Sequence, residues 1–600
     1  MKRVHCLFIC FVLLLSYVPL RAQWSGSVDV AGGLGGMEGS VVSDDAPMFH
    51  GLLKGAFRLN YDTDKFKWTA RVYESWEPNT TDNARLQYKN EQVSIVYKAA
   101  TTKPLTTGLR SDFLWTPSEN RNIAFWVLYE YTNDRARNHT LNFDGDVEDM
   151  EKFSYYYEIP VMDGHKLATG LQTYRSFNSG RNILQSSFVF QTMHSDRVNT
   201  WTVFKYGEGV EGGMTYDIDD AEGHIWKYRI TPKSTDFDFD GDIHLQNTLI
   251  DGEVQLKLTP GARLSIRHAL DHNSGATQTS TPDEGEAIWV DSISLRENFN
   301  FLSLKGEPFL AFDFRWRSLE AHADYGCQVY GRRLNDDTHH QPLKIKGFYP
   351  VGNANIKWNI NPRHSLNLTN MMSVAHPDYI KVCWYDRTAG YLDQLYRGNE
   401  QLLSPQIRRY ALEYEFKTNR FVTQTAVSYT KVLDEIEQTW TNEEIGGREY
   451  KVFKWLNAAD SRTFGISEIL GWHGEIITAN LGVSYNQSRR KAKTGGAIKD
   501  SYYWMLMGDI SANLGKGWSV GVDAHYRSNV ATFFTLFKEY CQLNFRVQKD
   551  FERFSLFLEG RDLLDQERQT TFESEETQEF WVEEVRGNRR IFVIGGSWRF

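Results

Sequence analysis

The chain has 600 residues, of which 14% are aromatic, and a formal net charge of −10 at pH 7. This acidic balance argues against nucleic-acid binding, which depends on clustered basic charge. The mean hydropathy is −0.50, and after residue 22 no run of about 18 apolar residues occurs, so no transmembrane helix is predicted. Many aromatic residues in a polar chain are typical of alternating strands with interfacial aromatic girdles.

The first 22 residues have the pattern of a secretory signal peptide. Lys2 and Arg3 supply positive charge, an apolar segment covers residues 7–18, and Ala22 offers a small residue before the expected cleavage. We therefore expect residues 1–22 to be removed and residues 23–600 to form one exported domain. The mature cysteines (Cys327, Cys383 and Cys541) are too widely spaced to predict a disulfide framework or a metal site.

Segments of alternating apolar and polar residues recur along the mature chain, as in Phe57–Tyr61 and Phe66–Val72. Short turns are expected at 62–65, 117–120, 259–262, 417–420 and 515–517. Long acidic loops are expected at 133–149, 207–223, 271–286, 334–342 and 570–587. Alternation alone also suits a soluble β-sandwich, but the asymmetry of the connections favours a membrane barrel with short periplasmic turns and long extracellular loops. The sequence predicts an all-β fold, a single antiparallel transmembrane β-barrel of about 22 strands, within about 18 to 26.

Three aspartates stand at alternate positions within D-F-D-F-D-G-D; they are Asp236, Asp238 and Asp240. Their spacing matches the start of a Ca²⁺ loop, but Asn247 occupies the position of the usual bidentate glutamate. The alternative is an amphipathic strand with Phe237 and Phe239 toward lipid and the aspartates toward the lumen. Alternation explains the phenylalanines, which the Ca²⁺ motif does not. Weak Ca²⁺ binding stays open, and no other cofactor is expected.

The sequence predicts no enzymatic site. It contains no G-x-S-x-G, H-E-x-x-H or phosphate-loop motif. His339 and His340 lie beside Asp336 and Asp337, but such residues in a polar loop more often form a solvated surface than a catalytic pair. Charged residues of the strands are expected to face the lumen and to pair across it; they are Lys67, Arg71, Arg263, Arg267, Glu413, Glu415, Asp523, Arg527 and Arg546.

The final strand, I-F-V-I-G-G-S-W-R-F, ends on Phe600 and resembles the terminal assembly signal of bacterial outer-membrane barrels. This implies the barrel-assembly machinery and outer-membrane lipid as partners. The segment carrying Gly398, Asn399, Leu402 and Pro405 resembles a G-N-x-x-L-x-P motif of TonB-dependent receptors and the related Bacteroidetes-type outer-membrane β-barrel family, with Leu403 as one extra residue. Residues 556–565 resemble the penultimate strand of that family.

The resemblance implies a receptor-type barrel in the bacterial outer membrane. It covers residues 347–600 by motifs, whereas strand-like sequence already starts at Trp24 and leaves too few residues for a plug domain. We therefore expect a plug-less relative of TonB-dependent receptors that transports or binds a solute, with loops, lumenal side chains or a partner protein occluding the pore. The alternative is a non-transporting anchor whose loops hold a surface lipoprotein or a glycan.

Overall fold

The structure is a computed structural model. It describes residues 24–36, 49–77, 79–89, 92–146, 149–205, 226–279, 289–291, 297–336, 339–382, 386–388, 394–445, 448–564, 566, 568–573, 580–586 and 590–599. The predicted signal peptide, Cys383, the acidic loop at 207–223 and the terminal Phe600 lie wholly or mainly outside these residues. The division into residues 1–22 and 23–600 therefore stays a prediction.

In the described chain, 22 strands form a closed wall, each antiparallel to its two neighbours. The wall strands are β1 (Trp24–Gly36), β2 (Phe49–Asp62), β3 (Phe66–Trp76), β6 (Leu105–Ser118), β7 (Arg121–Arg135), β9 (Asp149–Phe177), β10 (Asn182–Lys205), β11 (Trp226–Ile250), β12 (Val254–Thr279), β14 (Glu297–Trp316), β15 (Leu319–Asp336), β16 (His339–Asn361), β17 (His364–Val374), β20 (Gln406–Lys417), β21 (Phe421–Ile445), β22 (Arg448–His473), β23 (Ile477–Ala492), β24 (Ile498–Gly515), β25 (Trp518–Arg527), β28 (Tyr540–Asp550), β29 (Phe554–Arg561) and β32 (Ile591–Arg599).

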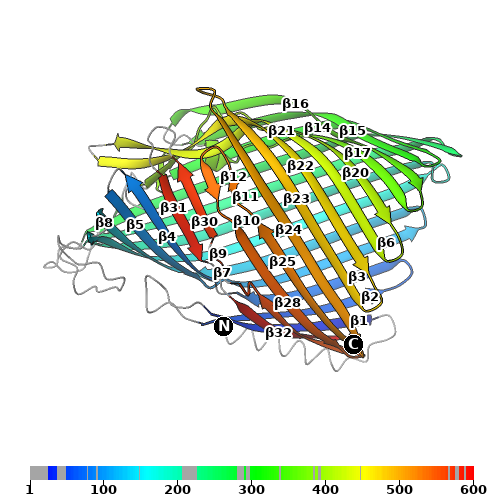
Figure 1. The fold of residues 1–600 in the computed structure, drawn as a ribbon, viewed down its shortest axis with the longest axis horizontal. Coiled ribbons are helices and arrows are strands. Elements are labelled where there is room, and N and C mark those ends of the chain that lie inside the picture. The colour runs from blue at the N-terminus through cyan, green and yellow to red at the C-terminus, as the bar shows by residue number, and fades with distance from the viewer. Residues whose placement is uncertain are drawn as a thin grey trace.

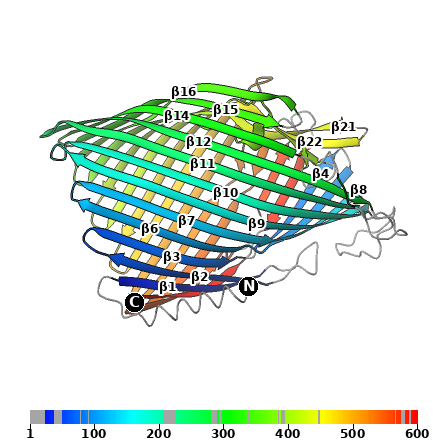
Figure 2. The ribbon, with the colours of Figure 1, turned by 180° about the vertical axis from the view of Figure 1, so that it is seen from behind.

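The wall closes where its first strand meets its last. β1 pairs with β32 from Ser27↔Arg599 to Gly35↔Ile591, and the two strands lie side by side in Figures 1 and 2. The strands run obliquely around the barrel, as closure of a sheet requires. The predicted all-β barrel of about 22 strands is confirmed.

Alternation places apolar side chains on the outside of the wall. On β14, Leu302, Leu304 and Leu310 are exposed, whereas Phe301 and Phe309 on the other face are buried. Six of the exposed tryptophans lie near one end of the barrel, each close to a turn or to the end of β32; they are Trp115, Trp316, Trp358, Trp472, Trp518 and Trp598, whereas Trp504 is exposed farther along β24. Such a ring is the aromatic girdle that marks a membrane interface.

The two ends of the barrel differ, as the sequence predicts. Short turns and the end of β32 share one end, which by the barrel pattern is periplasmic. The turn expected at 259–262 is wrong, because β12 continues through it and the chain turns at 251–253 instead. Pro260 is accommodated because Thr259 and Pro260 have no partner on the β11 side, so no ladder hydrogen bond is missed there.

Several loops expected at the extracellular end are largely strand. The additional strands are β4 (Asn79–Lys89), β5 (Gln92–Thr102), β8 (Arg137–Asp146), β13 (Trp289–Asp291), β18 (Asp386–Thr388), β19 (Gln394–Arg397), β26 (Val530–Ala531), β27 (Thr535–Phe537), β30 (Arg568–Glu573) and β31 (Phe580–Arg586). The expected loop at 133–149 is mostly β7 and β8, and the one at 570–587 is mostly β30 and β31. Polar strands can extend beyond the membrane because they find hydrogen-bond partners in one another, as β4 does in β5 and β31.

The described chain contains little helix. α2 (Tyr379–Val382) is a single turn between β17 and β20. Within the described ranges, no helix combines the length and the apolar character that a membrane span requires.

Substitutions at two neighbouring glycines can test how closely β1 and β32 pack at the seam. A Cβ on Gly33 would lie 2.9 Å from the Phe592 carbonyl oxygen, which belongs to the backbone, whereas a Cβ on Gly32 meets only the Leu52 oxygen at 3.7 Å. We expect Gly33→Ala to destabilise the barrel by about 1–3 kcal/mol through overpacking, and Gly32→Ala to change stability little. The measurement is the temperature at which the fast-migrating folded band disappears on a gel. Equal midpoints for the two variants would contradict this packing of the seam.

Candidate functional site

The connection between β17 and β20 folds onto the inner face of the barrel, and we call residues 375–405 the strap. Its described parts are 375–382, 386–388 and 394–405. Near its start, Asp378 approaches Arg267 of β12 at 3.7 Å. Near its end, the Leu402 carbonyl accepts a hydrogen bond from Arg332 of β15 at 3.4 Å. Both arginines share the inner face, because outward neighbours such as Val329 are exposed.

His376 fixes the strap to β15. Its ring stacks on Tyr330 with a centroid separation of 3.6 Å and an interplanar angle of 6°. The side-chain amide of Gln328 donates from Nε2 to the Glu307 carboxylate, which can only accept. The Gln328 Oε1 therefore faces His376 Nε2, at 2.6 Å. That nitrogen must therefore carry the proton, and Nδ1 accepts from the Ser404 hydroxyl at 2.9 Å.

In the neutral imidazole, Nε2 donates to Gln328 and Nδ1 accepts from Ser404. His376 lies in the strap, outside the membrane-spanning strands. Its pKa is lowered to about 4, mainly by burial and also by the positive charges of Lys305 and Arg332. Protonation would add a positive charge beside Lys305 and Arg332, and the Ser404 hydroxyl would have to turn from donor to acceptor.

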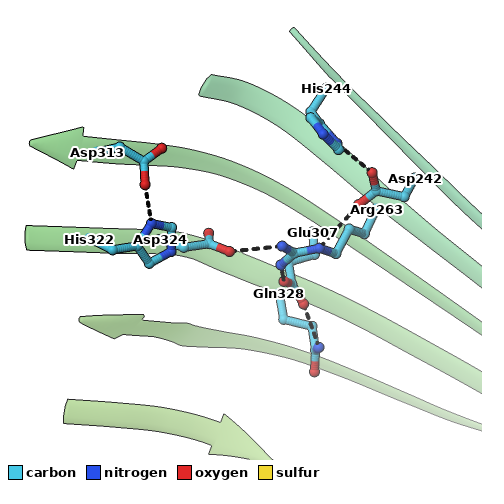
Figure 3. A network of polar contacts seen from close by, with 8 residues as sticks. All are labelled: Asp242, His244, Arg263, Glu307, Asp313, His322, Asp324 and Gln328. Atoms are coloured by element: carbon cyan, nitrogen blue, oxygen red, sulfur yellow. Dashed lines mark hydrogen bonds and ion pairs between the residues drawn. The ribbon is translucent and has the colours of Figure 1, made fainter. Parts of the chain in front are cut away.

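Glu307 belongs to a larger polar network centred on Arg263 of β12 (Figure 3). The Arg263 guanidinium contacts Asp242 at 3.3 Å, Glu307 at 2.6 Å and Asp324 at 2.8 Å. Its charge also lies 4.1 Å from the ring centre of Phe309. One cation thus holds three carboxylates from β11, β14 and β15, and Gln328 extends the network to the strap.

The network continues in the other direction through His244, whose Nδ1 lies 2.7 Å from Asp242 and whose Nε2 lies 2.9 Å from Gln185. Hydrogen bonds and ion pairs therefore run from β10 to the strap along the inner wall. The lumenal charges were expected to pair across the pore. Instead, those with described partners pair mainly along the wall, as Arg546 does with Glu559 on the next strand at 3.7 Å.

The motif residues hold the strap in place. The Asn399 backbone N–H donates to the Lys381 carbonyl at 2.7 Å, and its side-chain Nδ2 donates to the Trp455 carbonyl of β22 at 3.1 Å. Leu402 is 2% exposed, and the Pro405 carbonyl accepts from the Ala375 N–H where the two ends of the strap meet. Gly398 lies between β19 and Asn399. The residues that carry the family resemblance are thus attachment points of the strap.

The extracellular parts of β21 and β22 form a two-stranded ribbon, comprising residues 435–458, to which the strap also attaches. β19 pairs in parallel with β22 over Lys451–Lys454. Glu443 in the ribbon forms ion pairs with Arg397 of the strap at 2.7 Å and with Lys454 at 2.6 Å. Strap and ribbon are therefore joined by backbone and by charge.

A second connection reaches the same ribbon. The hairpin of β26 and β27 docks on Glu437, whose carboxylate accepts hydrogen bonds from the Thr532 hydroxyl and the Phe533 and Phe534 N–H groups at 2.9–3.0 Å. Arg490 of β23 donates to the Ala531 carbonyl at 2.7 Å. Glu437 is 9% exposed, so these bonds replace the water that it loses.

A third connection, between β29 and β32, supplies β30. β30 pairs with β27 and with β31. Its Phe572 packs against a buried pair in the ribbon, Trp440 and Phe453, together with Tyr396 of the strap. Three connections distant in sequence therefore converge on one ribbon at the extracellular end.

The three aspartates of the predicted Ca²⁺ motif lie in β11, on the same face as Asp242 of the Arg263 network. Asp238 lies 3.6 Å from Arg267 of β12. Within the described ranges, no group of three or more His, Cys, Asp or Glu side chains is placed to hold a metal ion. Ca²⁺ binding at Asp236, Asp238 and Asp240 stays a prediction without support from this geometry. The side chains of His339 and His340 lie outside the described ones.

Sequence reasoning missed Glu437 and the stacking of His376 on Tyr330. Glu437 sits in a segment where charged and apolar residues alternate as in any strand, so no local signal distinguishes it. His376 is followed by Pro377 and Asp378 in a stretch without strand alternation, and this irregularity is the local signal that points to it.

The docking of the hairpin on Glu437 can be tested with one substitution. We expect Glu437→Ala to lose charge-assisted hydrogen bonds worth roughly 1.5–3 kcal/mol each and to expose residues 530–537. Hydrogen–deuterium exchange in that segment should accelerate at least tenfold, whereas Glu444→Gln, an exposed glutamate in the same strand, should leave it unchanged. Unchanged protection in Glu437→Ala would contradict the docking.

The strap should loosen in acid. The pKa of His376 is lower when the strap is attached than its ordinary value of 6.5, so the detached strap binds a proton more readily. Attachment of the strap therefore weakens as pH falls from about 6.5 toward 4. Amide exchange in residues 375–382, corrected for the intrinsic effect of pH, should accelerate over that interval. His376→Gln should remove most of the pH dependence, and a slope that persists in this variant would assign it to another group.

Comparisons with known proteins agree with the architecture. Residues 330–598 match the model of the outer membrane protein beta-barrel family. The siderophore receptor PiuA from Acinetobacter baumannii has a TM-score of 0.60 and 11% identity, covering 97% of this chain and 82% of the receptor. The siderophore receptor PirA from Pseudomonas aeruginosa has a TM-score of 0.54 and 12% identity, covering 97% of this chain and 81% of the receptor. The ferric preacinetobactin receptor BauA from Acinetobacter baumannii has a TM-score of 0.56 and 9% identity, covering 97% of this chain and 80% of the receptor.

No curated protein matches the sequence. At these identities, the solved structures show a shared fold and nothing about ligands. The family match, the closed wall and the aromatic girdle together determine where the protein resides. It is a bacterial outer-membrane β-barrel built like siderophore-receptor barrels, and its residues 330–598 match the outer membrane protein beta-barrel family.

Proposed function

We propose that this protein is a receptor-like barrel that binds a solute and passes it through its lumen, under the control of its own extracellular connections. The observation that carries the proposal is the convergence of the strap, the β26–β27 hairpin and β30 on the ribbon of β21 and β22. The cleaved signal peptide at 1–22 and insertion by the barrel-assembly machinery are parts of this proposal.

The width of the barrel is the physical reason for proposing that the connections control passage. A barrel with this many strands encloses a lumen that must be filled or closed to prevent leakage. Connections bound to the inner wall provide an obstruction held by hydrogen bonds and packing, so it can open without unfolding the wall. The charged and polar inner wall beside the strap suits a polar solute better than an apolar one.

A second candidate is an anchor that binds a surface lipoprotein or a glycan. It is favoured by the length of several strands, because β9 has 29 residues and β22 has 26, whereas a crossing needs about 9–11. The excess builds a sheet beyond the membrane, as the projecting strands in Figures 1 and 2 show. Such a sheet offers a surface to a partner.

Conductance in planar bilayers tests the transport function. We expect the folded wild-type protein to show small or rare current steps, because the connections obstruct the lumen. Glu437→Ala should give larger and more frequent steps, since the hairpin is released, and Glu444→Gln should behave like the wild type.

Liposome swelling with sugars and amino acids on the same preparations gives the size of the permitted solute. A folded barrel that shows neither current nor swelling, in the wild type and in Glu437→Ala alike, would contradict transport and leave the anchor as the better function.

A further inference from the structure

Two cations lie together on the inner wall beneath the strap. Arg332 of β15 stands opposite Ser303 of β14, and Lys305 of β14 stands opposite Tyr330 of β15. The two are therefore diagonal neighbours on one face, about 7–8 Å apart at their Cα atoms. In the described part of the chain, neither forms an ion pair with a carboxylate.

Arg332 is buried with much of its hydrogen-bonding capacity unused. It is 4% exposed, and its Nη2 donates to the Leu402 carbonyl at 3.4 Å, a long hydrogen bond. Its Nε and Nη1 have no hydrogen-bond partner in the described chain. A buried charge without a counter-ion is costly, and a second cation beside it adds repulsion.

The acids nearest in the wall are already engaged. Glu307 and Asp324, on the same two strands, contact Arg263, and Asp378 of the strap approaches Arg267. The site around Arg332 and Lys305 therefore keeps a positive charge next to a network that holds three carboxylates. The low pKa of His376 agrees, since both cations contribute to it.

We propose that Arg332 and Lys305 form a binding site for an oxyanion group, a carboxylate or a phosphate, with the strap as its cover. The proposal rests on the proposed function and adds the charge class of the solute. A guanidinium presents paired N–H donors that match two oxygens of either group, and the lysine adds a point charge from the next strand. An anion that takes Nη2 would displace the weak bond to Leu402 and thereby loosen the strap.

Isothermal titration calorimetry on the folded full-length protein in micelles at low ionic strength tests the site, with inorganic phosphate and succinate as separate probes. We expect at least one of them to bind, and the stronger probe identifies the group. Arg332→Gln should weaken binding at least tenfold and Lys305→Gln about threefold or more. Arg315→Gln, on the same strand as Lys305 but with a side chain 62% exposed near the periplasmic turn, should bind as the wild type does.

Folding of each variant is checked by its fast-migrating gel band. If Arg332→Gln does not fold, Lys305→Gln carries the test. Failure of the folded wild type to bind either anion would overturn the site, and so would binding that both variants retain. Anion binding by a protein that shows neither current nor swelling, in the wild type and in Glu437→Ala alike, would refute transport but keep the site, whereas conductance without anion binding would refute the site alone.

Discussion

Satisfaction of the backbone hydrogen bonds inside lipid is the constraint on which the structure depends. A sheet crossing a bilayer cannot leave an edge unpaired, because lipid offers neither donors nor acceptors. The antiparallel pairing of β1 with β32 meets this requirement by joining the two ends of the described chain. Gly33 allows the strands to approach closely there, since a side chain would collide with the partner backbone.

Closure with 22 strands creates a second problem, which is the space inside. Parts of three connections fold back onto the inner wall or onto the ribbon of β21 and β22. Each is fixed by a different interaction: His376 hydrogen-bonds and stacks, Glu437 accepts backbone N–H groups, and Phe572 packs on Trp440 and Phe453. All three interactions lie at the extracellular half, where polar strands already extend beyond the membrane.

The inner wall is electrostatically uneven. Arg263 contacts three carboxylates, including Glu307 of β14 and Asp324 of β15. On these same two strands, Lys305 and Arg332 lack any acidic partner in the described chain. Such a separation of charge between neighbouring positions is costly in a folded protein unless something else compensates for it. The strap covers the uncompensated part and contacts the network through Gln328, so events at one position can affect the other.

Local sequence patterns correctly predict the all-β class, the outward apolar face and the approximate strand number, because alternation with period two and the asymmetry of connections can be read along the chain. The sequence also located the strap motif at Gly398–Pro405, through resemblance. It misjudged 259–262 as a turn, since a proline tolerated by a gap in the ladder looks locally like one that ends a strand. It also expected loops where β8 and β30 pair with distant strands.

Which residues of the connections meet one another depends on the three-dimensional fold. Glu437 and Phe533 are far apart in sequence, and so are Phe572 and Trp440, so no local pattern could associate them. Their contacts depend on how each connection folds back onto the wall. The isolation of Arg332 likewise follows from where neighbouring carboxylates point, which strand register and side-chain packing determine together.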